Sequence, residues 1–377
     1  MQAVHAPFLV YLRDAAMVVT ILEYVIQNAR RQAIPLLLIG GLFLVHAAIG
    51  LYCMGDYRQV AFGTKFLMAC FFGAAVAPVL FRPSTLMLWF FAAILSSALL
   101  GLAINAVVGQ MPWSGLSYYV GDVKVSATRL DLAAGTERMA GFSRSSSTVA
   151  TIVSFLSLYA IVAFRSVWPR LLAFAIAMPA LYLTNNKASM ASFLLATLFY
   201  QFIGRYRPTL MKAFVGVTFL LMILTPVAFI DIRINMPSAA TLSLYSFVDR
   251  VDHSWPEAWA LIFDHGLGVL GRGIGGIGTA QRAFAPDLFS AADNFFIYLT
   301  AYFGIFAVVY IGYVAIAVGR APFPSARRDV DLAFLVLASI GLAGVTSQVF
   351  EETTAAMFLG AAIAIVCQAV PARRFSA

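Results

Sequence analysis

The sequence predicts an all-α integral membrane protein that forms one polytopic domain over residues 1–377. Hydrophobic residues make up 62% of the chain and charged residues only 11%, and the mean hydropathy is +0.88. Soluble domains carry about 25% charged residues, so this composition is typical of polytopic membrane proteins. Apolar runs near the ~20 residues that a helix needs to cross a bilayer recur along the whole chain.

The apolar runs predict about eleven membrane-spanning helices. In chain order, the expected ranges are 7–27, 33–53, 60–80, 85–109, 145–164, 171–184, 188–204, 213–231, 292–318, 330–347 and 353–369. The first range contains Arg13 and Asp14 and has no basic segment before it. We therefore expect a membrane helix there and not a cleavable signal peptide.

The basic residues of the short connections predict how these helices cross. Cytoplasmic loops retain Lys and Arg, and alternate connections of this chain carry about half of them. They are Arg30, Arg31, Arg82, Arg165, Arg170, Arg205, Arg207, Lys212, Arg320, Arg327, Arg328, Arg373 and Arg374. If every helix crosses, the N-terminus and the two long connections, residues 110–144 and 232–291, share the other face. In a bacterium that face is the periplasm and the membrane is the inner one.

The formal net charge of +8 does not predict a nucleic-acid partner, because topology accounts for about half of the basic residues. Cys53, Cys70 and Cys367 all fall within predicted helices, which leaves no disulfide framework and no paired metal-ligand spacing. No HExxH-like motif gathers histidines and carboxylates in the sequence. We expect neither a metal ion nor another cofactor.

The region Asp249–Gly304 is unusually polar for this chain, and most of it lies in the long connection 232–291. An amphipathic helix is expected over Ser254–Asp264, because Ser254 can cap it and Glu257, three residues later, completes a capping box. One face of this helix would carry Trp255, Trp259 and Ile262. Such a face could lie on the membrane surface or close over a site.

The glycine-rich segment Gly268–Gly278 follows this helix. It contains two matches to G-x-G-x-x-G, but a dinucleotide site needs a preceding strand inside a βαβ unit. The segment could pack closely against helix ends, or it could turn backbone amides toward a phosphate or a sugar.

Basic residues on the predicted periplasmic side run against the expected bias and indicate an anionic partner. They are Arg129, Arg138, Arg144, Lys187, Arg233, Arg250, Arg272 and Arg282. Guanidinium groups bind phosphate oxygens bidentately, so several of them can hold a diphosphate at the membrane surface. Contacts with lipid headgroups, or ion pairs with Asp131, Glu137, Asp249 or Asp252, are the alternative explanation.

Asp293 and Asn294 lie at the start of the ninth predicted helix, where an Asp is also an ordinary helix cap. The functional alternative is a carboxylate at the bilayer surface, whose partial desolvation raises its pKa and makes it a usable general base. Tyr298, about one turn further along, could support this base or contact a sugar.

Lys65 lies inside the third predicted helix, where a charge is costly unless it is paired or faces a polar cavity. Arg13 and Asp14 are adjacent in the first helix and are not expected to face each other. Lys65 is therefore expected to point toward the same outer site as the arginines.

Several short motifs resemble, in their order and topology, those of the bacterial O-antigen polymerase and ligase superfamily. They are Arg138-x-x-Gly141, Thr184–Ser189 at the start of a helix, Arg250-x4-Trp255-x3-Trp259, Gly268–Gly278, and Asp293-Asn-x3-Tyr298-x5-Gly304. The resemblance covers most of the chain, from residue 33 onward.

This resemblance implies a GT-C-like membrane glycosyltransferase that takes a glycan from an undecaprenyl-diphosphate carrier at the periplasmic face. It implies that Arg138 and Arg250 hold the diphosphate, with Lys187 where many relatives have Arg. Lysine supplies charge but not a bidentate fork. Ligases of the superfamily characteristically have His where this chain has Asp293, which favours a polymerase.

We therefore expect a polymerase that joins lipid-linked repeats into O-antigen, capsule or exopolysaccharide. The expected catalytic residues are Asp293, Arg250 and Arg138, and the diphosphate would contact Arg138, Lys187, Arg250, Arg272 and Lys65. Sugar rings would contact Tyr118, Trp255, Trp259, Asn294 and Tyr298. The reaction would need no metal, because the diphosphate already activates the sugar. Membrane lipids and a chain-length regulator protein are candidate partners.

Two alternatives stay open. A ligase would move the glycan onto lipid A core instead of another repeat unit. A transporter or flippase for a lipid-linked saccharide would use the outer arginines as a gate, but it would keep its polar groups near the bilayer midplane and often contain repeats. No repeat is evident in this sequence, and its polar groups lie in the outer connections.

Overall fold

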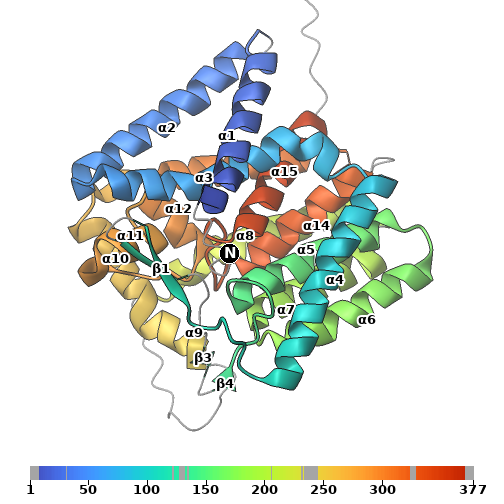
Figure 1. Cartoon of the computed structure of the whole chain (residues 1–377). Helices are drawn as coiled ribbons and strands as arrows, with labels where there is room; N and C mark the ends of the chain where they lie inside the picture. The colour runs from blue at the N-terminus through green and yellow to red at the C-terminus, as the bar shows by residue number, and fades with distance from the viewer. Residues whose placement is uncertain are drawn as a thin grey trace, which may run out of the picture.

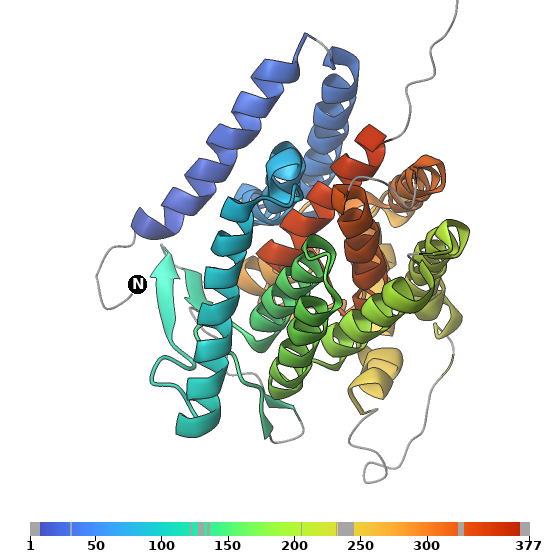
Figure 2. The same cartoon turned by 90° about the vertical axis from the view of Figure 1, so that its right-hand side faces the viewer.

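The computed structural model is an almost wholly helical protein (Figures 1 and 2). It describes residues 8–30, 32–120, 123–126, 132–133, 136–204, 206–230, 232, 245–322 and 328–369. Within these residues, strands occur only as two short antiparallel hairpins in the first long connection.

The first part of the chain forms helices where the apolar runs lie. They are α1 (Phe8–Asn28), α2 (Ala33–Met54), α3 (Tyr57–Leu80), α4 (Thr85–Val108), α5 (Ser146–Ala163), α6 (Val167–Leu183), α7 (Lys187–Phe199) with the π-helical turn η2 (Tyr200–Gly204), and α8 (Pro208–Ala228). Strand β1 (Ser117–Val120) pairs with β2 (Val123–Ser126), and β3 (Leu132–Ala133) pairs with β4 (Thr136–Glu137). Side chains that accept a hydrogen bond from the first turn set four of the helix starts: Asp56, Ser84, Ser145 and Asn186.

The second part of the chain has shorter elements before it returns to long helices. They are α9 (Tyr245–Asp249), η3 (Arg250–Ser254), α10 (Trp255–Asp264), η4 (Gly268–Leu270), α11 (Thr279–Phe284), η5 (Pro286–Leu288), α12 (Phe295–Phe303), α13 (Phe306–Arg320), α14 (Arg328–Ala343) and α15 (Thr353–Ala369). The predicted range 292–318 is thus two helices. They break at Gly304, whose φ of 56° and contact with the backbone of Leu270 leave no room for a side chain.

The helices have the length and composition of a membrane protein. Five of them, α2, α3, α4, α5 and α8, are long and apolar enough to cross a membrane, and α6, α13 and α15 are shorter apolar helices. Each of the eleven predicted ranges contains a helix. Large apolar side chains such as Ile34, Leu38 and Leu86 are exposed, as a lipid environment allows. The prediction of a helical membrane protein is confirmed to this extent.

Helix α14 is the centre of the bundle. All its residues from Val330 to Gly341 are buried, and it packs against α5, α7, α8 and α15. Its buried Asp331 accepts a hydrogen bond from the Tyr200 hydroxyl at 3.1 Å. Helix α15 in turn lies along α3, and both views show α1 and α2 as a hairpin at the edge of the bundle (Figures 1 and 2).

The helix ends gather at two poles of the bundle. The starts of α5, α7 and α15 meet the end of α14 around Ser147, Asn186, Ala343 and Glu352, and we name this pole the site end. The starts of α4 and α14 meet the ends of α5 and α15 around Arg82, Arg165, Arg328 and Gln368, and we name this pole the basic end. Arg82, Arg165 and Arg328, which belong to short connections, thus lie at the basic end, as the predicted orientation requires of the short basic connections.

Two glycines allow α3 and α15 to approach each other closely. A Cβ atom at Gly73 would overlap the backbone of Met357, and one at Gly360 would overlap the carbonyl group of Cys70. Small residues let helix backbones approach within a membrane, where van der Waals packing holds helices together. The α3–α15 contact therefore depends on hydrogen atoms at both positions.

Gly360→Ala is expected to destabilise the protein by about 1–3 kcal/mol, the usual cost of an overpacked contact. Gly312→Ala is the matched control, because α13 has open space around Gly312. Alanine there should be neutral or stabilising by up to about 1 kcal/mol, since it favours helix. Thermal unfolding in detergent measures both effects, and equal melting temperatures for the two variants would contradict this account of the α3–α15 contact.

Candidate functional site

Asn294 fixes the backbone at the start of α12. Its Oδ1 accepts a hydrogen bond from the Ile297 amide at 3.0 Å, so it is the helix cap. Its Nδ2 donates to the carbonyl oxygens of Met222 at 3.2 Å and Val345 at 3.0 Å. The side chain is fully buried, and its amide ties α12 to α8 and α14. We predicted a sugar contact for Asn294, but the structure gives it this capping role.

Asp293 does not cap α12, because Asn294 supplies the cap. Ala292 has φ 57° and Asp293 has φ 21°, a backbone region that residues with side chains rarely adopt. Such strain often accompanies functional positions. The Asp293 carboxylate, 31% exposed, lies 3.2 Å from a guanidinium nitrogen of Arg250.

Arg250 comes from a continuous helical segment, residues 245–264. The predicted cap at Ser254 is wrong: Ser254 has helical backbone angles, and its side chain makes no capping hydrogen bond. Pro256 has no N–H group to continue the α-helical pattern, and a π-helical turn over 250–254 precedes it, with the Trp255 amide bonded to the Arg250 carbonyl. Arg250 stands at the start of this turn, and its Nη1 donates to the Ser246 carbonyl at 2.6 Å.

Arg138 reaches the same place from the first long connection. The Asn105 side chain at the end of α4 accepts hydrogen bonds from the amides of Ala140 at 3.2 Å and Gly141 at 3.0 Å. Gly141 has φ 56° and packs against the backbone of Gly101. This turn positions Arg138 close enough to Asp293 to affect its titration.

The surroundings of Asp293 shift its pKa upward. Burial raises the pKa of Asp293 above its ordinary value, and the negative charge of Glu351 adds to the increase. Arg250 and Arg138 lower this pKa, but they do not cancel the effect of burial. Asp293 can therefore exchange a proton at a higher pH than an ordinary aspartate.

Glu351 is a member of this group that the sequence analysis missed. It precedes α15, and its carboxylate accepts hydrogen bonds from the backbone amide of Thr279, from the Thr279 hydroxyl at 2.5 Å and from Gln348 Nε2 at 2.9 Å. The buried Tyr298 hydroxyl lies 3.4 Å from Glu351 Oε1 and 3.0 Å from the Tyr302 hydroxyl. We expected Tyr298 to support Asp293 or to contact a sugar, but its hydroxyl lies against Glu351 instead.

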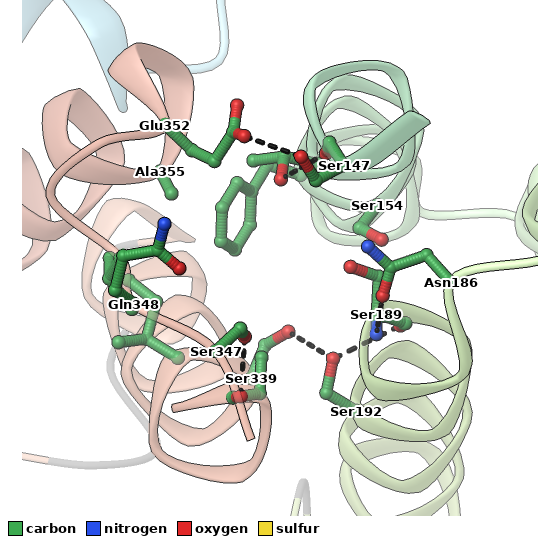
Figure 3. A pocket seen from close by; sticks show the side chains of 15 residues that line it. Ser147, Ser154, Asn186, Ser189, Ser192, Ser339, Ser347, Gln348, Glu352 and Ala355 are labelled. Carbon is green, nitrogen blue, oxygen red and sulfur yellow. Dashed lines mark hydrogen bonds between the residues drawn. The ribbon is translucent and has the colours of Figure 1, made fainter. Parts of the chain in front are cut away.

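A polar cavity of about 60 Å³ lies beside these carboxylates between α5, α7, α14 and α15 (Figure 3). We name it the serine well, and its labelled polar side chains surround an open centre: Ser147, Ser154, Asn186, Ser189, Ser192, Ser339, Ser347, Gln348 and Glu352. The size is sufficient for a few ordered water molecules. Gln348 lines the well and also bonds to Glu351, so the well adjoins the carboxylates.

Most polar side chains named here from the serine well have hydrogen-bond partners, and one does not. Glu352 accepts from the Ser147 hydroxyl at 2.5 Å and the Thr148 hydroxyl at 2.7 Å. The hydroxyls of Ser192 and Ser339 are 3.3 Å apart. Ser154 is buried in the wall, and its hydroxyl has no hydrogen-bond partner among the described residues. The Ser154 hydroxyl is therefore able to bond to a water molecule or to a hydroxylated ligand in the well.

Lys65 does not belong to this group of residues. Its Nζ lies 2.6 Å from the Asp14 carboxylate, which joins α3 to α1. Arg13 also bonds to Asp14, at 2.9 Å, so the expectation that these neighbours cannot meet is wrong. The long arginine side chain folds back along the helix, and Asp14 neutralises Lys65 inside the protein.

Arg272 lies elsewhere as well. Its amide donates to the Ala301 carbonyl at 2.7 Å, near the far end of α12. Ala301 lies six residues after Phe295, the first residue of α12, which corresponds to about 9 Å of helix rise away from the Asp293 end. The Arg272 side chain is 3% exposed, and its Nε and Nη1 have no hydrogen-bond partner among the described residues. Arg272 is thus a buried cation outside the Asp293 site.

The glycine segment packs against helices, the first of its two predicted roles. The Ile274 amide donates to the His46 carbonyl at 3.1 Å, and Gln59 Nε2 donates to the Gly275 carbonyl at 2.9 Å. Gly273 has φ 76°, and a Cβ atom there would overlap the backbone of Gly50. The backbone groups of the glycine segment thus hold residues 232–291 against α2 and α3.

The tryptophan face of α10 is also used for packing. Trp255 is 1% exposed and contacts Phe247, while Trp259 is half-buried between Phe263 and Phe296. The predicted amphipathic helix is confirmed, but Trp255 has no open face for a sugar.

Of four further predicted residues, one lies beside the serine well and three have side chains outside the described residues. Lys187 is exposed at the first position of α7, next to Asn186 of the serine well. Tyr118 belongs to β1, and its side chain lies outside the described residues, as do Arg129 and Arg233. Among the described residues, no three His, Cys, Asp or Glu side chains come together as a metal site requires.

Comparisons with known proteins add no family assignment. The chain matches no protein-family model, no curated protein and no solved structure. The motif resemblance therefore stays a prediction.

The raised pKa of Asp293 predicts a pH-dependent effect of Asp293→Asn on stability. A carboxyl whose folded-state pKa is raised contributes stability that is complete below its ordinary value of 3.8. That contribution is lost as the pH rises through the folded-state pKa. Asparagine resembles the protonated acid, so Asp293→Asn should melt at a higher temperature than the unmodified protein at neutral pH.

The difference should shrink as the pH falls toward 3.8, the ordinary value for this group. Asp249→Asn serves as the control, because the Asp249 side chain is 51% exposed. Thermal unfolding in one detergent across this pH range measures the effect. A stability difference for Asp293→Asn that does not change with pH would show that the argument from burial is wrong.

Proposed function

We propose that the protein is a glycosyltransferase of the bacterial inner membrane that polymerises glycan repeats carried on undecaprenyl diphosphate. The observation that carries the proposal is the Arg250–Asp293 ion pair, with Arg138 and Glu351 close by, at the edge of the serine well. It supplies two arginines for a diphosphate and a carboxylate with a raised pKa. These are the groups that transfer from a glycosyl diphosphate requires.

The arginines suit the leaving group of this reaction. Arg138 and Arg250 each have a buried Nε without a hydrogen-bond partner among the described residues. A buried donor without a partner is costly, and phosphate oxygens would satisfy both. Negative charge develops on the diphosphate as its bond to the sugar breaks, so fixed guanidinium groups stabilise the transition state.

Asp293 is the proposed general base. The acceptor hydroxyl oxygen forms a bond to the anomeric carbon of the donor, and the bond from that carbon to the phosphate oxygen breaks. The electron pair leaves with undecaprenyl diphosphate, and the hydroxyl proton moves to Asp293. A raised pKa brings the carboxylate closer to neutral pH, where a base accepts a proton more effectively.

The serine well is the proposed subsite for the acceptor sugar. Its hydroxyl, amide and carboxylate groups can exchange hydrogen bonds with sugar hydroxyls. Its volume accommodates the hydroxyl-bearing edge of a sugar ring or the water that this edge displaces. Gln348 connects the well to Glu351, which would place the acceptor beside Asp293.

The proposed orientation in the membrane is based on the arginines of the basic end. With the basic end in the cytoplasm, the site end faces the periplasm, where lipid-linked repeats are expected. The eleven helical ranges would then each cross the membrane, and the arginine and carboxylate side chains would lie at its surface. This position supports an enzyme more than a transporter, whose polar groups would lie near the midplane. Asp293, where related ligases carry His, supports polymerisation over ligation.

Arg250→Ala is expected to reduce glycan extension by about 10²–10³-fold, the usual effect of removing one transition-state donor. The assay supplies purified protein with lipid-linked repeat units and resolves the product ladder on a gel. Arg250→Lys should recover only part of the activity, since lysine lacks the bidentate fork. Arg58→Ala is the control, because Arg58 is exposed and pairs with Asp56.

Normal ladders from Arg250→Ala would contradict the role of this arginine. The same assay with added lipid A core separates the two transfer reactions. If products form only when lipid A core is present, the protein is a ligase and the proposed polymerase activity is wrong.

Ser192→Val is expected to raise the KM for the acceptor by up to about tenfold, since it removes a hydrogen-bonding group from the wall of the well. The KM for the donor should not change, because the arginines hold the diphosphate. Ser157→Val is the matched control: this serine is equally buried but does not line the well. Equal changes in both KM values for Ser192→Val would exclude an acceptor subsite there.

A further inference from the structure

The basic end of the bundle contains a second cavity, which the proposed reaction does not use. It has a volume of about 690 Å³ and is open to the surroundings. The ends of α3 and α15 and the starts of α4 and α14 surround it. We name it the basic cleft, and it is lined by Arg82, Arg165, Arg328, Asp329, Gln368 and neighbouring apolar residues.

The charges of the basic cleft favour an anion. Three guanidinium groups face one carboxylate, and the Asp329 carboxylate already accepts a hydrogen bond from the Val330 amide at 2.9 Å. Arg328 donates to the Ala163 carbonyl at the end of α5, which fixes one guanidinium in the wall. The starts of α4 and α14 add the partial positive charge of helix N-termini.

Two of the three arginines have exposed side chains that are available to a ligand. Neither Arg82 nor Arg165 forms a side-chain hydrogen bond or ion pair with any described residue. They belong to different connections, 81–84 and 164–166, which the fold brings to one cavity. An exposed arginine pair of this kind can hold one phosphate group between two forks.

The surroundings of the cleft suit a lipid. Leu86 and Trp89 on the first turns of α4 are 78% and 73% exposed, and Trp168 at the start of α6 is 79% exposed. Helices α4 and α6 contact each other. Exposed tryptophans mark the level of lipid headgroups in membrane proteins. The arginines thus lie at headgroup level, with apolar surface beside them for acyl chains.

We propose that the basic cleft binds the phosphate of an anionic phospholipid headgroup, between Arg82 and Arg165. The site is at the pole opposite Asp293, so it does not depend on the proposed transfer reaction. A basic pocket between membrane helices binds such headgroups by charge and by the adjacent acyl contact. Free phosphate offers the same charge but lacks the acyl chains.

Native mass spectrometry of the detergent-purified chain tests this proposal. Phosphatidylglycerol, zwitterionic phosphatidylcholine and inorganic phosphate are titrated separately. We expect a saturable phosphatidylglycerol adduct that is much tighter than the other two. An arginine near a membrane surface contributes about fivefold in affinity, so Arg82→Gln with Arg165→Gln should weaken this adduct by about 25-fold.

Arg320→Gln is the matched control, because Arg320 is an exposed arginine that does not line the cleft. It should bind phosphatidylglycerol as the unmodified protein does. Circular dichroism and thermal unfolding without lipid verify that the double variant folds, as expected for two exposed residues. Unchanged phosphatidylglycerol binding by the folded double variant would overturn the site, and equal affinity for inorganic phosphate would overturn its assignment to a lipid.

Discussion

A hydrocarbon environment gives backbone and side-chain polar groups no partner except the protein itself, and this constraint organises the whole bundle. The start of α12 illustrates it. Asn294 uses its complete amide to satisfy the Ile297 amide and the carbonyls of Met222 and Val345. Asp331 is likewise buried with a hydrogen bond from Tyr200. Irregular backbone is therefore found where neighbouring helices cover it.

The same constraint explains why the glycine segment is so rich in glycine. Residues 271–278 enter between α2, α3 and α12, and their backbone groups must find partners at short range. Gly273 and Gly275 lie against the backbones of Gly50 and Gln59, where any Cβ atom would collide. The partners, such as the carbonyl of His46, belong to helices far away in the sequence. The segment thus holds the long connection against the bundle, and the amides of Arg272, Gly273, Ile274 and Gly278 already donate to backbone carbonyls of the protein.

Helix positions could be predicted because apolar runs and bilayer thickness determine them locally. The association of Arg138, Arg250 and Asp293 could also be anticipated, since these polar side chains lie at one pole of an apolar bundle. The partners of the buried charged residues could not be predicted in this way. Lys65 pairs with Asp14, and Arg272 is buried beside the end of α12, because both depend on how distant helices meet. The adjacent acids Glu351 and Glu352 at the start of an apolar helix were the available signal for the missed carboxylates.

Caps and aromatic faces show a related limit. Ser254 satisfied the local pattern of a capping box, but the chain before it is helical, so no free amides required a cap. At α12 two candidates were adjacent, and the three hydrogen bonds of Asn294 decided which one caps. Local sequence defines the possible caps, and tertiary contacts select among them.

The role of Asn294 as the cap of α12 affects the proposed chemistry at Asp293. Because Asn294 caps the helix, the charge partner of the Asp293 carboxylate is the guanidinium group of Arg250 and not the backbone amides of α12. A bound diphosphate would compete for that guanidinium, and the loss of an attractive positive charge would raise the pKa of Asp293 further. In the proposed reaction, donor binding therefore strengthens the base at the moment when an acceptor can be used. Before the donor binds, the ion pair with Arg250 keeps the carboxylate a weaker base.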